Sequence, residues 1–158
     1  MAITQAMCTS FKAELMLAVH DFRATGGDTF KLSLYTSSAT IDANTTSYTS
    51  SNEVSSVSTN YTAGGGTLVN LGVVTSNNTA STGVGFTDFS DLTFANATIT
   101  ARGALIYNTT PSANSNANTT LTNAAVCALD FGSDKTSTTS FTVQMPANTS
   151  TSALIRLV

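Results

Sequence analysis

Few residues in this chain could carry out acid–base chemistry. His20 is the only histidine, and Asp21 follows it directly. An imidazole held by a carboxylate is a common general base. Neighbouring residues on a helix point in different directions, however, so Asp21 is poorly placed to orient His20. We interpret His20 as a side chain in the last turn of a helix, where a histidine interacts favourably with the helix dipole.

Carboxylates occur in two close pairs, Asp88 with Asp91 and Asp130 with Asp134. A glycosidase needs two carboxylates on either side of a sugar, and a calcium loop needs several oxygens that converge on one point. Neither pattern is present. Both pairs stand among turn-forming residues, which predicts aspartates at strand ends that accept hydrogen bonds from their own backbone. A surface cation site is the alternative interpretation.

The remaining motifs also lack partners for chemistry. Cys8 and Cys127 have neither a zinc-site nor a redox spacing, so we interpret both as buried small apolar residues. The three glycines at 64–66 lack the Lys-Ser/Thr of a phosphate loop and predict a tight turn or a hinge. Residues 130–132 spell the Asp-Phe-Gly triplet of kinases without the other kinase motifs. We therefore predict no catalytic, cofactor-binding or metal-binding residue, and no enzyme.

The composition points the same way. The 158 residues include 20 Ser, 30 Thr and 13 Asn, whereas only six are Lys or Arg and nine are Asp or Glu. Six scattered cations cannot form the basic patch that nucleic-acid binding requires. A hydrophobic content of 41% argues against disorder. No apolar run approaches the length of a membrane span, and the N-terminus does not resemble a secretory signal, so we expect no membrane contact.

One amphipathic helix is expected near the N-terminus, over residues 5–23. Its apolar side chains recur at spacings of three and four residues, which places them on one face. Thr4 is the predicted N-cap, Ile3 and Cys8 form the predicted hydrophobic staple, and Gly26-Gly27 is the predicted stop. Such a face must pack on the rest of the domain. The helix is therefore expected to lie across a sheet.

From residue 28 onward the pattern becomes that of short strands. Residues 30–35 alternate between apolar and polar, and the runs 104–107 and 125–129 are apolar on both faces, so we place these two runs centrally. We expect Phe141, Val143 and Met145 to point inward, with Pro146 ending that strand. The expected strands are 30–35, 67–74, 85–89, 92–94, 97–100, 102–107, 124–131, 139–145 and 153–158.

Two long polar stretches, about 37–66 and 108–123, separate these strands. Loops of this length are usually functional, and we expect 37–66 and 111–123 to contact partners more than they hold the fold together. The predicted fold is a single domain over 1–158. It is mainly β, an antiparallel β-sandwich or curved sheet with one N-terminal amphipathic helix packed on it.

Several segments resemble a family of small virion structural proteins of tailed bacteriophages. The similar segments cover nearly the whole chain, and the most specific are Ala-Arg-Gly-Ala-Leu-Ile-Tyr-Asn at 101–108 and Leu-Asp-Phe-Gly-Ser-Asp-Lys at 129–135. The first of these two extends back to residue 97 and the second to residue 128. The other similar segments are 10–15, 19–22, 28–36, 53–55, 61–65 and 153–157. The resemblance implies a structural component of the virion and no catalytic residues. The Asn/Ser/Thr-rich insert after Tyr107 departs from the family's shorter pattern.

Three functions follow as hypotheses. The first is a capsid decoration or cement protein, a homo-oligomer (trimer or dimer) that binds the major capsid protein on the outer surface of the head. The second is a neck, tail or fibre-base protein of the same virion. The third is a carbohydrate-binding module or small hydrolase, suggested by the polar loops and by Tyr35, Tyr48, Tyr61 and Tyr107, although the chain has no Trp for sugar stacking.

Overall fold

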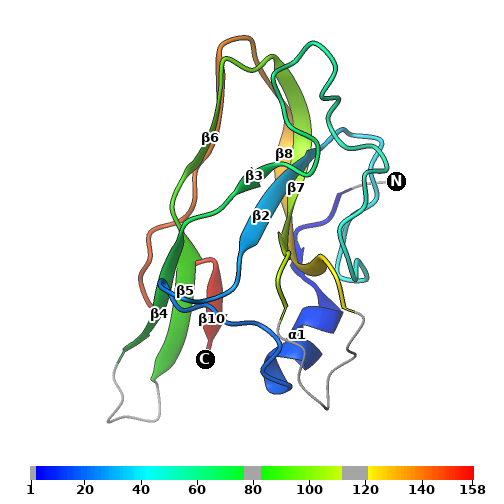
Figure 1. Cartoon of the computed structure of the whole chain (residues 1–158). Helices are drawn as coiled ribbons and strands as arrows, with labels where there is room; N and C mark the ends of the chain where they lie inside the picture. The colour runs from blue at the N-terminus through cyan, green and yellow to red at the C-terminus, as the bar shows by residue number, and fades with distance from the viewer. Residues whose placement is uncertain (1–2, 77–82, 112–120) are drawn as a thin grey trace.

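The computed structural model describes residues 3–76, 83–111 and 121–158, and these residues form a mainly antiparallel β structure with one short helix (Figure 1). The expected fold class is confirmed. In chain order the elements are β1 (Ala6–Met7), α1 (Thr9–Met16), β2 (Phe30–Tyr35), β3 (Gly66–Thr67), β4 (Asn70–Ser76), β5 (Val84–Phe89), β6 (Leu92–Ala95), β7 (Ile99–Asn108), β8 (Ala124–Ser137), β9 (Ser140–Val143) and β10 (Ile155–Leu157).

The strands form two layers. One layer is a five-stranded sheet in the order β1-β8-β7-β2-β3. The other layer consists of a three-stranded sheet, β10-β5-β4, and the two-stranded β6-β9 sheet. Only two residues separate β5 from β6, so the β6-β9 sheet continues directly from the three-stranded sheet. In Figure 1 the five-stranded sheet lies to the right and the two smaller sheets lie to the left. All strand pairs are antiparallel.

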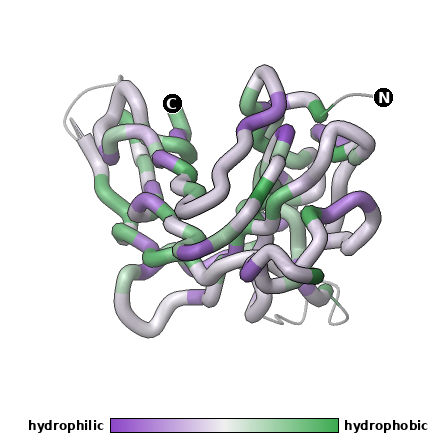
Figure 2. Tube along the Cα trace, turned by 90° about the horizontal axis from the view of Figure 1, so that it is seen from above, coloured by the Kyte–Doolittle hydropathy of each residue, from purple (hydrophilic) through white to green (hydrophobic). Residues whose placement is uncertain are grey.

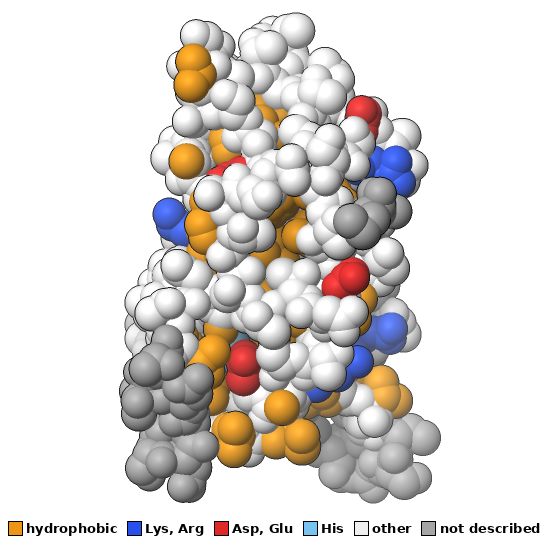
Figure 3. All heavy atoms as spheres, turned by 90° about the vertical axis from the view of Figure 1, so that its right-hand side faces the viewer, with side chains coloured by type: hydrophobic (Ala, Val, Ile, Leu, Met, Phe, Trp, Pro, Cys, Tyr) orange, Lys and Arg blue, Asp and Glu red, His pale blue; other side chains and the backbone are white. Residues whose placement is uncertain are grey.

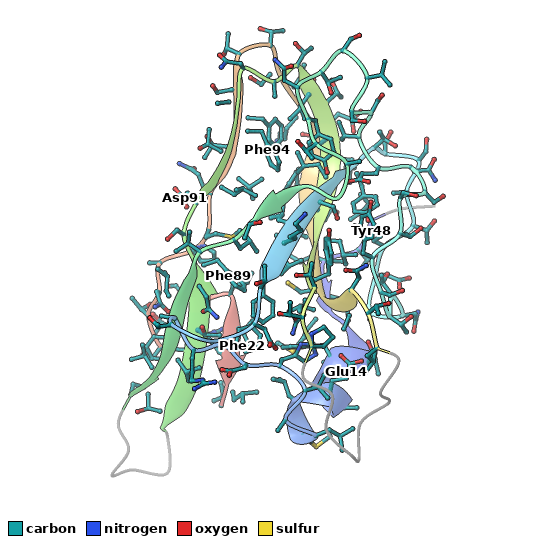
Figure 4. All side chains as sticks on the ribbon, viewed as in Figure 1. Glu14, Phe22, Tyr48, Phe89, Asp91 and Phe94 are labelled. Atoms are coloured by element: carbon teal, nitrogen blue, oxygen red, sulfur yellow. The ribbon has the colours of Figure 1, made fainter. Side chains whose placement is uncertain are left out.

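The core lies between the layers and is rich in aromatic rings. Phe22 stacks on Phe30 with ring centroids 4.5 Å apart, and Phe30 contacts Phe89 from the opposite layer at 5.4 Å. Figure 4 shows Phe22 and Phe89 directed into the space between the layers. Higher in the same space, Tyr61 contacts Phe94 at 5.3 Å. Such aromatic pairs add contact energy to the large apolar area that the rings remove from water.

The central strands confirm the placement derived from their apolar runs. β7 is the middle strand of the five-stranded sheet, and β8 lies next to it. Their residues Leu105, Ile106 and Val126 are fully buried. β2 has the predicted bounds. The predicted strands 97–100 and 102–107 are instead one strand, β7, because a register shift between Ala101 and Gly103 interrupts the alternation without ending the pairing. The predicted strand 67–74 is divided between β3 and β4.

The predicted helix over 5–23 is wrong in its bounds. The helix spans only Thr9–Met16, because Ala6 and Met7 pair with β8 as β1 before it begins. Cys8, and not Thr4, is the N-cap, and it makes no side-chain cap hydrogen bond. Ala18 has a φ of 54°, which turns the chain out of the helix well before Gly26 and Gly27. Val19 and Phe22 are buried, as their spacing predicted, but they lie on non-helical chain that enters the core.

The polar segment 37–66 holds the fold together more than expected. Ala39, Ile41, Val54 and Tyr61 from this segment are buried in the main core. Backbone bridges join Glu53 to Tyr35 and Ser47 to Ala124, so the segment covers the outer face of the five-stranded sheet. The prediction that this segment mainly contacts partners is therefore not supported by its packing. Most of the second predicted loop, 111–123, lies outside the described residues.

Candidate functional site

A cleft lies between the three-stranded sheet and the chain from the end of α1 onward. Its volume is about 460 Å³, within the usual range for ligand sites. Its apolar walls come from Leu15, Ala18, Phe22, Val73, Phe86, Ile155 and Leu157, and its polar groups from His20, Asp21, Arg23 and Thr87. We call this hollow the apolar cleft. Two of the elements that line it, α1 and β10, lie at the lower end of the molecule in Figure 1.

His20 is buried in the wall of the apolar cleft and is not in the last turn of the helix, so the helix-dipole interpretation is wrong. Its Nε2 lies 2.7 Å from Oε2 of Glu14, and its Nδ1 lies 3.0 Å from Nδ2 of Asn108. An amide nitrogen can only donate, so Nδ1 accepts and Nε2 carries the proton that is donated to Glu14. Figure 4 shows Glu14 at the base of the five-stranded sheet, on α1.

The surroundings of His20 favour its neutral form. Burial lowers its pKa below the ordinary 6.5, although the hydrogen bond and the charge of Glu14 act in the opposite direction. Asn108 also donates to Oδ2 of Asp28, at 2.7 Å, and Asp28 accepts from the backbone N–H of Asp21, at 2.8 Å. The network therefore joins α1, the chain after it and the end of β7. The carboxylate of Asp21 pairs with Arg23 and not with the His20 ring.

This geometry does not assemble a hydrolytic site. Both ring nitrogens of His20 are engaged, so neither is available to accept a proton from a bound substrate. Thr87 is the hydroxyl residue in the cleft wall, and its Oγ1 donates to the carbonyl oxygen of Gly72 at 2.9 Å. What the apolar cleft offers a ligand is aliphatic and aromatic contact.

A second, partly buried network surrounds Glu53. One carboxylate oxygen of Glu53 accepts from the Tyr61 hydroxyl and the Gly64 backbone N–H, each at 2.7 Å, and the other accepts from the Tyr48 hydroxyl at 2.7 Å. The Tyr107 hydroxyl donates to the Gly64 carbonyl oxygen at 2.6 Å. Burial is the main cause that raises the pKa of Tyr107 to about 12 and the pKa values of the other tyrosines above their ordinary value.

Three of the four tyrosines, Tyr48, Tyr61 and Tyr107, belong to this network, and the Tyr35 hydroxyl donates to the Thr49 carbonyl oxygen at 2.6 Å. Tyr35, Tyr61 and Tyr107 are buried, and Tyr48 stacks on Tyr107 with ring centroids 4.8 Å apart. Figure 4 shows Tyr48 directed toward the sheet from the chain segment that covers it. Tyr35, Tyr61 and Tyr107 therefore present no ring face to a sugar, and Tyr107 covers one face of the half-buried Tyr48. Sequence reasoning missed Glu53, although it is the only charged residue between Asp42 and Asp88, and that isolation was the available signal.

As predicted, Asp88 and Asp130 accept hydrogen bonds from nearby backbone N–H groups, those of Phe89 and Gly132, but the aspartates also join distant segments. The carboxylate of Asp88 accepts from the backbone N–H groups of Phe89 and Leu154, and that of Asp91 accepts from Met145. Together they attach the segment after β9 to the three-stranded sheet. In Figure 4 Asp91 lies where β5 passes into β6.

Asp130 and Asp134 lie inside β8 and not at a strand end. Gly132, with a φ of 76°, forms an irregularity where the register with β7 shifts, and the strand then resumes. Asp130 pairs with Arg102 on β7 at 3.1 Å, and the Gly132 N–H donates to the same carboxylate. Within residues 3–76, 83–111 and 121–158, no group of three or more His, Cys, Asp or Glu side chains could hold a metal ion.

The cysteines and the glycine run behave as predicted. Cys8 and Cys127 are buried and unbridged, and burial raises the pKa of Cys8 to about 11. A thiol with such a pKa is largely unreactive at neutral pH. Gly64 and Gly65 have φ values of 84° and 73° in a tight turn closed by a 2.8 Å hydrogen bond from the Gly65 N–H to the Thr62 carbonyl oxygen.

Comparisons with protein-family models, with curated proteins and with solved structures give no match for this chain. Among the described residues, no helix is long and apolar enough to cross a membrane.

Proposed function

We propose that this protein is a non-enzymatic structural component of a bacteriophage virion, and that it decorates the outer surface of the icosahedral head by binding the major capsid protein. The resemblance of its sequence segments to small virion proteins supports this proposal. The structural observation that carries it is the location of the reactive side chains. His20, Glu53 and Asp88 make contacts that join segments of the fold, as do the tyrosines.

The exposed surface also supports an assembly role. Most of the surface in Figure 3 is neither charged nor apolar, and blue and red atoms are scattered. Figure 2 shows the same along the chain, where most of the trace is near white because Ser and Thr have hydropathies close to neutral. A surface with few cations has little attraction for packaged DNA. Exposed hydroxyl groups can still hydrogen-bond to a neighbouring subunit.

Cryo-electron microscopy of virions of the phage that encodes this protein tests the proposal. We expect density for the protein at regular sites on the capsid lattice. Mass spectrometry of the same particles should give a ratio to major capsid protein between about one to one and one to three. Bare lattice sites, with density only at the portal or tail, would contradict the decoration role.

A neck, tail or fibre-base position is the second candidate, and the open edge of the three-stranded sheet favours it. β4 is seven residues long and carries no charge, and within residues 3–76, 83–111 and 121–158 its one partner strand is β5. Such an edge can add a strand from a neighbouring subunit, as in a ring or a stacked assembly. The copy number separates the two candidates, because this position predicts on the order of a dozen copies per particle.

A carbohydrate-binding role is less well supported than the sequence suggested, since three of the four tyrosines belong to the Glu53 network and the buried Tyr35 hydroxyl donates to the Thr49 carbonyl oxygen. A glycan array with purified protein checks this conclusion. Binding to any glycan would reopen that role, and a blank array together with a capsid-lattice position would support the proposal.

A further inference from the structure

The side-chain amide of Asn108 has a fixed orientation. Its Nδ2 donates to Oδ2 of Asp28 at 2.7 Å, and its Oδ1 accepts from the backbone N–H of Thr110 at 2.9 Å. A carboxylate offers only acceptors and a backbone N–H is only a donor, so exchanging the two ends of the amide would oppose like groups on both sides. The same Nδ2 lies 3.0 Å from Nδ1 of His20. The group of Asn108 that faces the imidazole is therefore a donor.

This orientation accepts only the neutral form of His20. A neutral imidazole has one acceptor nitrogen, whereas both nitrogens of the charged form carry a proton. A proton on Nδ1 would point at the N–H of Asn108, and that N–H would lose its acceptor. Both side chains are buried, so neither group can turn to water while this part of the structure stays closed. A charged His20 and the observed position of Asn108 therefore exclude each other.

Two carboxylates face the ring among the residues that the structure describes. Glu14 of α1 accepts from Nε2 at 2.7 Å, and the negative charge of Asp28, in the chain before β2, acts on the ring from beside Asn108. On the stretch that carries His20, Asp21 and Arg23 pair with each other. Both carboxylates attract a proton to the ring, so the contact with Asn108, together with burial, is what keeps the ring neutral.

The other elements around the ring and the cleft beside it contribute uncharged side chains. These are Phe11 of α1, Phe30 of β2, Asn108 of β7, Phe86 and Thr87 of β5, and Ile155 and Leu157 of β10.

Asn108 also secures the place where β2 and β7 stop pairing, opposite Phe30. Just beyond it, the N–H and Oγ1 of Thr109 both donate to the Thr29 carbonyl oxygen, at 2.9 and 2.8 Å, and the Thr29 N–H donates to Oγ1 of Thr110 at 2.8 Å. We call these contacts, together with those of the Asn108 side chain, the clasp. The threonine side-chain contacts are exposed, and exposed hydrogen bonds add little to stability. Without Asn108 the clasp is therefore weakly held.

We propose that His20 is a proton-sensitive switch of the clasp: when the ring becomes charged, Asn108 leaves its position and the clasp between residues 108–110 and 28–29 opens, while the sheets stay folded. The closed form excludes the extra proton, whereas the open form accepts it near the ordinary histidine pKa of about 6.5. The opening equilibrium is therefore constant above about pH 6.5 and increases about tenfold for each pH unit below it. Because His20 is part of the wall of the apolar cleft, the opening lies beside that cleft.

Heteronuclear NMR of the full chain between about pH 8 and pH 5 measures the switch. The nitrogen signals of the His20 ring report its charge, and hydrogen exchange, corrected for the intrinsic effect of pH, reports the opening. We expect the backbone N–H groups of Thr29, Thr109 and Thr110 to lose about tenfold of their protection for each pH unit below about 6.5. Leu105 and Ile106, in the middle strand of the five-stranded sheet, should keep theirs.

Two variants separate the switch from burial alone. His20→Gln keeps an acceptor for Asn108 and a donor for Glu14 but cannot become charged, so the protection of its clasp should not depend on pH. Asn108→Ala removes the donor that faces Nδ1, so His20 should become charged at a pH at least about one unit higher than in the unsubstituted chain. Thr136→Ala is the matched control. It removes a 3.0 Å hydroxyl contact with Thr100 elsewhere on the same sheet and should leave the titration of His20 unchanged.

Circular dichroism verifies that each variant is folded, and the His20→Gln comparison stands alone if Asn108→Ala does not fold. Loss of protection in Leu105 together with the clasp would overturn the proposal, because acid would then unfold the whole domain. Unchanged protection of the clasp at pH values below 6.5, or the same pH dependence in His20→Gln, would also overturn it. So would a proton that enters Glu14 and leaves His20 neutral, which the NMR signal of the Glu14 carboxyl carbon detects.

Discussion

At the scale of single residues, Glu53 makes the clearest energetic prediction. Its carboxylate accepts hydrogen bonds from two tyrosine hydroxyls and one backbone N–H. Truncation by Glu53→Ala leaves these donors without their acceptor in a partly buried place, which costs part of the desolvation of each group. We expect the free energy of unfolding, measured by urea denaturation, to fall by about 2–4 kcal/mol.

Ser56→Ala is the control for this measurement. Ser56 lies three residues further along the same segment and is exposed, so its substitution should change the free energy of unfolding by less than about 0.5 kcal/mol. Equal stability of the Glu53→Ala variant and the unsubstituted chain would mean that the network contributes nothing to the fold.

His20 predicts a dependence of stability on pH. Its pKa in the folded protein is lowered from the ordinary 6.5, mainly by burial, so the unfolded chain binds the proton at higher pH than the folded chain does. The stability that neutral His20 contributes is therefore fully present above about pH 6.5 and is lost as the pH falls below it. The largest slope from one such group is about 1.4 kcal/mol per pH unit.

His20→Gln removes this titration and keeps a hydrogen-bonding side chain. We expect the free energy of unfolding of this variant to change less between about pH 7.5 and pH 5 than that of the unsubstituted chain. Parallel pH profiles would show that His20 does not titrate differently in the two states.

At the scale of elements, the turn before β3 depends on the missing side chain of Gly65. A Cβ at this position would lie 1.7 Å from the carbonyl oxygen of Leu32 on β2, whereas a Cβ on Gly26 would meet nothing within 4 Å. Both glycines have nearly the same positive φ, 73° and 74°. Gly26→Ala should cost about 1 kcal/mol in thermal unfolding, and Gly65→Ala should prevent folding or cost several times as much. Similar losses for the two would contradict the close approach.

The elements also show what the sequence could predict. Strand β2 was predictable to the residue because alternation reports directly which face is buried. The helix was overextended because a spacing of three and four residues predicts burial of Val19 and Phe22 but not the conformation that buries them. The turn at Ala18 requires a positive φ in a residue that rarely adopts it, and no local signal announces that.

At the scale of the whole molecule, the contacts that join distant segments were beyond sequence reasoning. Glu53 meets Tyr61 and Gly64 within its own segment, but the segment reaches the sheet through Tyr107, more than forty residues along the chain. Likewise, the neighbours of His20 come from α1 and from β7. The sequence drew attention to His20 and to the four tyrosines but not to Glu53, and the topology determines which of these residues meet. The apolar cleft arises in the same way, between elements at opposite ends of the sequence.

The four tyrosines set an alkaline limit for the whole fold. Burial raises their pKa values in the folded protein above the ordinary 10, so the unfolded chain loses these protons first, and stability is lost as the pH rises above about 10. Each phenol adds up to about 1.4 kcal/mol per pH unit to the slope. The tyrosines attach the 37–66 segment to the central sheet, so their ionisation and the loss of β structure should occur in one coincident transition. Absorbance at about 295 nm measures the ionisation, and circular dichroism measures the β structure. Gradual ionisation around pH 10, with the circular dichroism unchanged, would show that the rings are accessible and that this cluster does not hold the two parts together.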